Sequence, residues 1–227
     1  MGVIGTRLYL LVAIWFYTPG CFQMVDGDLF GLHKSTVCRI VIRVSSALAV
    51  LKNQYVTLNS TEETAAGFYK RARFPDVLGA IDFTYIPIPN PGGEKGELFR
   101  ILKGYCSINM QAVCDDKGQL SNIVARWPGS TNDSRIFDNS HLCAMLERGA
   151  YEGHLLRDNG HGYRGHLSTP LLNPQTPGER EYNTFNILPE VSESFWSVEK
   201  WIPVPTGGPP HEDGHYNDNH YCSGCSV

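Results

Sequence analysis

The chain has 227 residues, of which 42% are hydrophobic and 19% are charged. These proportions exclude a disordered chain and a coiled-coil fibre, and the length suffices for one sizeable domain with a small helical appendage. The formal net charge of −4 hides an asymmetry, because residues 1–75 are basic and the remainder is acidic. A basic head before an acidic body suits a binding module joined to a carboxylate-rich site.

The N-terminal segment contains an uninterrupted apolar run at residues 8–17, directly after Arg7. The run resembles the core of a signal peptide, but no small-residue cleavage site follows it. It is also too short to span a bilayer as a helix, so no membrane partner is expected. A buried helix is the favoured interpretation.

Residues 22–49 predict two helices around a tight turn at 31–33. In the second helix Ser35 is a candidate N-cap, and apolar residues recur at helical spacing. The apolar stripe is Val37, Ile40, Val41, Val44 and Leu48, and the basic residues off the stripe are Lys34, Arg39 and Arg43. This pattern is typical of a helix-turn-helix with a basic outer face, although a plain amphipathic helical pair remains the alternative.

The rest of the chain predicts an α/β fold. Residues 51–76 are a polar connector that ends in the basic cluster Lys70, Arg71 and Arg73. Strands are expected at 77–88, 105–114, 120–127 and 153–158, with a hairpin turn at 115–118 and helices at 134–148 and 191–201. Strands followed by interleaved helices indicate a layered α/β domain.

Three acidic residues stand where carboxylates are costly. Asp82 interrupts an apolar strand, Asp158 ends another, and Glu193 lies among apolar residues of a predicted helix. Carboxylates on neighbouring strand ends repel unless they share a proton or a metal. For each acid taken alone, a cap or a surface charge is the alternative.

Two features of the cysteines and the C-terminal tail bear on metal and redox chemistry. Seven cysteines without regular spacing argue against a disulfide framework, so buried reduced thiols are expected at Cys21, Cys38, Cys106, Cys114 and Cys143. The tail, residues 204–227, is polar, rich in Gly and Pro, and predicted to be disordered. It carries His211, His215, His220, Cys222 and Cys225, which suit zinc by type but not by order.

Four stretches of the chain carry a family resemblance. They read VLGAIDFTYIPI, KGYCSINMQAVCD, WPGSTNDSRIFDNS and LLRDNGHGYRGHLSTPLLNPQTP. Residues 77–201 thereby resemble the DDE domain of PIF/Harbinger-type transposases. FQMVDGDLFGLHKSTVCRIV resembles the helix-turn-helix that precedes this domain in the family.

The resemblance implies an RNase H-like mixed sheet with flanking helices at 77–203, preceded by a helix-turn-helix segment at 1–50. It also implies a divalent metal cation, Mg²⁺ or Mn²⁺, and hydrolysis of DNA phosphodiester bonds. The catalytic carboxylates would be Asp82, Asp158 and Glu193. Asp133 would be a further metal ligand or, alternatively, a cap for the helix at Ser134. Asp138 and Glu190 are nearby alternates.

The resemblance further implies DNA and a Myb-like DNA-binding protein as partners, and a nuclear location. Arg157 departs from the family, which has glycine there; it could pair with a carboxylate or phosphate, or crowd the metal site. The domain is also expected to be truncated at its C-terminus. A catalytically inactive DNA- or protein-binding derivative is therefore the competing interpretation.

Overall fold

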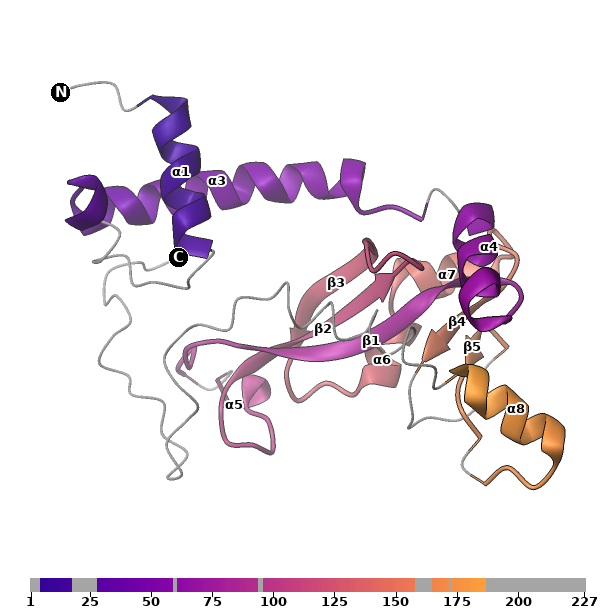
Figure 1. The fold of residues 1–227 in the computed structure, drawn as a ribbon. Coiled ribbons are helices and arrows are strands. Elements are labelled where there is room, and N and C mark those ends of the chain that lie inside the picture. The colour runs from indigo at the N-terminus through magenta and orange to yellow at the C-terminus, as the bar shows by residue number, and fades with distance from the viewer. Residues whose placement is uncertain are drawn as a thin grey trace. The chain divides into compact units, whose positions relative to one another are not determined.

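A computed structural model describes residues 5–17, 28–58, 61–93, 96–157, 165–171 and 173–186. These residues fall into two compact units, a helical unit that ends at Tyr55 and an α/β unit that begins at Val56 (Figure 1). None of the described helices is long and apolar enough to cross a membrane.

The helical unit consists of α1 (Thr6–Tyr17) packed on α3 (Lys34–Tyr55). The apolar run at 8–17 is a helix, as expected, but it buries only one side: Leu11 and Trp15 are exposed. The predicted stripe of α3 is largely confirmed, although Leu48 is exposed. Among the described residues of this unit, the buried apolar ones are Val12, Ala13, Val37, Ile40 and Val41.

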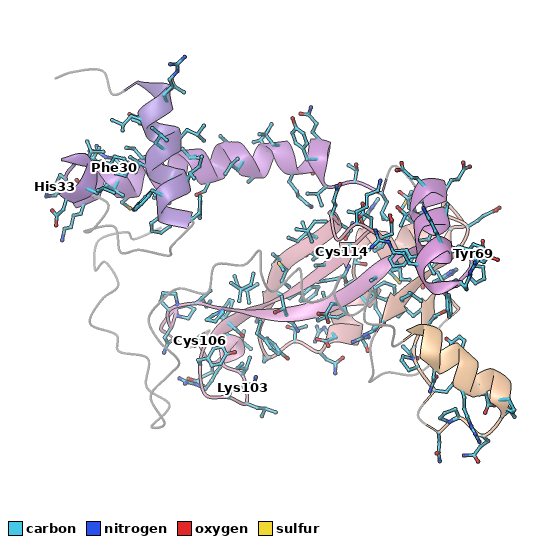
Figure 2. The ribbon with its side chains drawn as sticks, in the orientation of Figure 1. Phe30, His33, Tyr69, Lys103, Cys106 and Cys114 are labelled. Carbon is cyan, nitrogen blue, oxygen red and sulfur yellow. The ribbon has the colours of Figure 1, made fainter. Side chains whose placement is uncertain are left out.

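The turn before α3 forms where it was predicted, and its cap differs from the prediction. Gly31 has a φ of +61°, a left-handed conformation that favours glycine. The prediction that Ser35 caps this helix is wrong, because α3 begins at Lys34 and Ser35 therefore lies inside it. His33 is the residue directly before the helix (Figure 2). His33 Nδ1 accepts a hydrogen bond from the Ser35 N–H at 3.3 Å. Residues 18–27 lie outside the described residues, so the helix-turn-helix stays a prediction.

The α/β unit is built on a five-stranded mixed sheet with the order β3-β2-β1-β4-β5 (Figure 1). The long strand β1 lies between an antiparallel neighbour, β2, and a parallel one, β4. The strands are β1 (Val77–Pro87), β2 (Ser107–Cys114), β3 (Leu120–Pro128), β4 (His154–Arg157) and β5 (Leu167–Ser168). A mixed sheet with flanking helices confirms the predicted α/β class.

The turn between β2 and β3 is the predicted hairpin. Gly118 has a φ of +74° and donates its N–H to the carbonyl of Asp115 at 3.1 Å. The Asp115 carboxylate accepts from the Lys117 and Gln119 N–H groups at 2.9 and 2.7 Å. An aspartate that bonds its own turn backbone fixes this hairpin.

The helices of this unit depart from the sequence prediction in four places. The connector at 51–76 contains α4 (Thr61–Ala72), and α8 (Pro177–Asn186) follows the sheet. The single helix expected at 134–148 is two, α6 (Asp133–Asp138) and α7 (His141–Glu147). The break occurs because Ser140 caps α7, accepting from the Cys143 N–H at 3.1 Å. A short helix, α5 (Gly96–Phe99), lies between β1 and β2.

Each face of the sheet carries its own apolar cluster, because side chains alternate along a strand. Ile81 of β1 belongs to the cluster with α6 and α7, and Ala80 to the cluster with α4. Tyr182 of α8 packs on the Ala80 side. The buried members on the Ile81 side are Leu78, Ile81, Val113, Phe137, Leu142, Cys143, Leu146, Leu155 and Leu167. Those on the Ala80 side are Phe68, Phe74, Val77, Ala80 and Leu156, and a second cluster on that face consists of Met110, Ala112 and Cys114 of β2.

The described cysteines are reduced thiols, as predicted. Cys106 and Cys114 bracket β2 and are buried, as is Cys143 of α7 (Figure 2). Cys38 of α3 is half-buried. Cys21 lies outside the described residues.

The half-buried His154 at the start of β4 predicts a loss of stability in acid. Its Nε2 atom is buried without a hydrogen-bond partner among the described residues, and its ring stands edge-on to Phe74. Burial lowers the pKa of His154 below its ordinary value of 6.5, so the unfolded chain takes up the proton first. Stability present above pH 6.5 is therefore lost as the pH falls below it. Urea unfolding at pH 7.5 and 5.5 should show a larger loss for the native chain than for His154→Leu. Equal losses in the two proteins would contradict this account.

Candidate active site

Asp82 lies in the middle of the central strand, as predicted. It is half-buried and faces Ala112 across the β1–β2 ladder. Its Oδ1 atom accepts a hydrogen bond from the Phe83 N–H at 2.7 Å, which orients the carboxylate. By strand alternation Asp82 projects to the same face as Ala80, whose cluster includes Leu156 of β4.

The parallel ladder between β1 and β4 runs toward the second predicted carboxylate. Its last pair joins Ile81 to Arg157. The next residues in the two sequences are Asp82 and Asp158. Asp158, Glu193 and Glu190 lie outside the described residues, so their proposed roles stay predictions.

Asp133, the fourth predicted acid, begins α6 and has partners of its own. Its Oδ1 atom accepts from Asn109 Nδ2 at 2.9 Å, and its Oδ2 atom accepts from Arg157 Nη2 at 3.2 Å. The alternative that Asp133 caps the helix is wrong, because the cap is Asn132. The Asn132 side chain accepts from the Ser134 N–H at 2.9 Å.

Arg157 settles which face of the sheet Asp133 occupies. Its side chain is only 7% exposed, and its guanidinium carbon lies 4.7 Å from the centre of the Phe83 ring. Phe83 packs against the Ile81 cluster, on the face opposite Asp82. Asp133 therefore joins Arg157 on that opposite face, and this geometry gives no support to its predicted role as a metal ligand. The expectation that Arg157 pairs with a carboxylate is confirmed.

The described part of the chain does not by itself form a metal centre. Within it no three His, Cys, Asp or Glu side chains lie together in a metal-binding arrangement. The alternate acid Asp138 is exposed in the last turn of α6. A carboxylate site at Asp82 therefore needs donors from residues beyond the described ranges.

The sequence analysis missed a buried polar face of β2, whose Asn109 donates to Asp133. Ser107, Asn109 and Gln111 are fully buried and alternate with apolar residues along the strand. That period-two alternation was the available signal. Nearby, partial burial and the charge of Asp133 raise the pKa of Tyr85, so its phenol stays protonated at neutral pH.

Gly129 in the WPGSTND stretch brings the loop before α6 close to β2. Its N–H donates to the Ser107 carbonyl at 2.8 Å. A Cβ atom at this position would lie 2.8 Å from that carbonyl oxygen and 2.2 Å from Ser107 Oγ. The close approach requires glycine, and it fixes the loop that delivers Asp133 to Asn109.

The basic residues predicted to contact phosphate differ in whether they are exposed or paired with an acid. Lys34, Arg39 and Arg43 are exposed on α3 of the helical unit. In the α/β unit Arg71 pairs with the buried carboxylate of Asp116 at 3.6 Å. Lys70 of α4 and Arg73, which directly follows this helix, are exposed, and the guanidinium of Arg73 lies 5.6 Å from the centre of the Tyr69 ring (Figure 2).

The sequence of the chain is similar to those of known proteins. Residues 81–187 match the family model described as "DDE superfamily endonuclease". The protein named "Putative nuclease HARBI1" from Bos taurus is 34% identical over 185 residues, which is 79% of this chain and 53% of that protein. The Homo sapiens protein of that name is 33% identical over the same shares.

A plant relative, "Protein ALP1-like" from Arabidopsis thaliana, is 30% identical over 127 residues, 55% of this chain and 31% of that protein. The chain spans about half the length of the animal relatives that it matches. No solved structure matches the chain. The match over residues 81–187 and these relatives show that this part of the chain is a DDE superfamily endonuclease domain related to the Harbinger-derived putative nucleases.

Proposed function

We propose that the chain is a divalent-metal-dependent DNA endonuclease of transposase origin, built on an RNase H-like domain. The observation that carries the proposal is the position of Asp82. This half-buried carboxylate directly follows the last pair of the β1–β4 ladder. On the β4 side, the residue that follows the same pair in the sequence is Asp158.

The donor set fits a hard divalent cation. Asp82, Asp158 and Glu193 would supply carboxylate oxygens, the ligands that Mg²⁺ and Mn²⁺ prefer over the nitrogen and sulfur ligands of zinc. Asp133 is left out of the proposed set, because both of its oxygens accept bonds from Asn109 and Arg157. When bound, such ions activate water and neutralise charge on the phosphoryl oxygens.

The residues of the chain have separate tasks in this mechanism. Asp82 would supply a carboxylate at the middle of the sheet, oriented by the Phe83 N–H. Asp158 and Glu193 would complete the carboxylate set that holds the cation. No covalent intermediate on the protein is required, which agrees with the lack of a serine or cysteine nucleophile motif.

DNA is the proposed substrate, and exposed cations are its proposed contacts. Lys34, Arg39 and Arg43 on α3, together with Lys70 and Arg73, would neutralise backbone phosphates, so binding should weaken steeply with salt. A helix-turn-helix formed with α3, a Myb-like partner and a nuclear location belong to this proposal.

Thermal unfolding with added Mn²⁺ or Mg²⁺ tests the metal site. The full chain should carry serine at His211, His215, His220, Cys222 and Cys225, so that the tail cannot bind the ion; we name this protein the tail-substituted chain. An ion at one hundred times its dissociation constant should stabilise it by about 2.7 kcal/mol. Asp158→Asn should remove this stabilisation.

Cleavage of supercoiled plasmid DNA by the same protein tests the reaction. Nicking should require Mn²⁺ or Mg²⁺ and should be lost in Asp158→Asn. DNA binding without nicking or ion-dependent stabilisation would overturn the nuclease proposal and favour the binding derivative.

A further inference from the structure

Arg157 is the centre of a contact network that joins four elements of the α/β unit. Its guanidinium lies over the ring of Phe83 in β1 and donates to Asp133 at the start of α6. Asp133 in turn accepts from Asn109 of β2, which also donates to the Thr131 carbonyl at 3.0 Å. One side chain of β4 is thus tied to β1, α6 and β2.

The two ends of this network adjoin the two proposed strand carboxylates in the sequence. Phe83 is the residue after Asp82, and Arg157 is the residue before Asp158. Consecutive Cα atoms are held about 3.8 Å apart by a planar peptide unit. A shift of Arg157 relative to Phe83 is therefore passed directly to the neighbouring residues.

Because Arg157 is buried, its charge must be paired within the network. A charge whose side chain is 7% exposed is costly unless it is paired, and Asp133 supplies the pairing at 3.2 Å. The planar guanidinium can stack on an aromatic ring and donate at its edge at the same time, which the point charge of lysine cannot do. The end of β4 is thereby held at one position against β1.

We propose that Arg157 is a positioning residue, which fixes the described end of β4 against β1 through Phe83 and Asp133, next to the proposed metal site at Asp82. This inference rests on the proposed metal-dependent function. It also gives Asp133 a role, as the partner that neutralises Arg157 on the face of the sheet opposite Asp82.

Mn²⁺ binding to the tail-substituted chain, measured by isothermal titration calorimetry, tests the inference. Arg157→Met keeps an unbranched apolar side chain in this buried place and removes the guanidinium that lies over Phe83 and pairs with Asp133. It should weaken Mn²⁺ binding about 10-fold, as loss of a residue that orients metal ligands does. Asp133→Asn should have a similar effect. The double variant should resemble either single variant, because residues of one network are not additive.

The matched control is Arg126→Met. Arg126 lies 5.7 Å from the centre of the Trp127 ring and donates to the Asn139 carbonyl at 3.3 Å, but it is exposed on β3. Its loss should leave Mn²⁺ binding within about twofold of the parent. All titrations are made at a temperature where each variant is folded, as circular dichroism reports.

The outcomes separate this inference from the proposal on which it depends. If the tail-substituted chain does not bind Mn²⁺, or binds it equally well with Asp82→Asn, both the metal-dependent function and the positioning role are overturned. Mn²⁺ binding by Arg157→Met equal to that of the parent, with only a lowered melting temperature, would overturn the positioning role alone. If Arg157→Met does not fold, Arg157→Lys keeps the charge and decides the question: unchanged Mn²⁺ binding overturns the role, and weakened binding supports it.

Discussion

Asp82→Asn should reduce metal-dependent DNA cleavage to background while the fold persists. Asparagine keeps the shape of the side chain and an oxygen that can accept from the Phe83 N–H, so the strand should be unaffected. The variant lacks the negative charge that the proposed cation requires. Loss of several kcal/mol of charge stabilisation corresponds to a rate decrease of about 10³-fold or more.

Plasmid nicking and Mn²⁺-dependent melting of this variant should be measured together with DNA affinity. Nicking and ion-dependent stabilisation should both disappear, whereas DNA affinity should hold or rise, because a negative charge near the phosphates is gone. Asp138→Asn is the matched control, since Asp138 is an exposed aspartate of α6. Nicking by Asp82→Asn at the parental rate would show that this carboxylate has no catalytic role.

The strands of the α/β unit were predictable because their apolar character is local. Expected strands at 77–88 and 120–127 correspond to β1 and β3 within a residue at the ends. The hairpin turn could be placed from Asp115 and Gly118, whose side-chain and backbone preferences act within the turn itself. Asp82 was equally visible as a carboxylate inside an apolar run.

The helices α4 and α8 escaped prediction because they bury little. Phe68 and Thr64 are the buried side chains described on α4, so its sequence has no clear apolar stripe. The sequence before α8 does contain a local helix-start signal. Thr176 and Glu179 form a capping box, in which Glu179 accepts from the Thr176 N–H at 2.9 Å and donates its own N–H to Thr176 Oγ1 at 3.2 Å. Those backbone bonds also lower the pKa of Glu179.

The partners of Asp133 could not be read from the sequence, because they depend on tertiary pairing. Asn109 and Arg157 are 24 positions away from it in opposite directions, and only the strand order β2-β1-β4 brings them to one face. A sequence can show that a carboxylate precedes a helix. Which face of the sheet that helix covers follows from packing across the whole unit, here through Phe137 of α6.

Gly153→Ala should destabilise the α/β unit more than any other alanine substitution at its described glycines. Gly153 has a φ of +130°, a conformation that residues with a side chain rarely adopt. An added Cβ would also lie 2.4 Å from the Asp76 carbonyl oxygen, which accepts the His154 N–H at 2.9 Å. Backbone strain and this contact together should cost at least about 3 kcal/mol.

Urea unfolding of the full chain measures this cost, and two glycines provide matched controls. Gly149 also has a positive φ, +69°, but nothing lies within 4 Å of an added Cβ, so Gly149→Ala isolates the backbone strain at about 1 kcal/mol. Gly165→Ala, with open space and no positive φ, should change stability little. A cost for Gly153→Ala no larger than that for Gly149→Ala would mean that the Asp76 carbonyl yields easily. The start of β4 would then be compliant, and the position of Arg157 at its end would depend on the contacts with Phe83 and Asp133 alone.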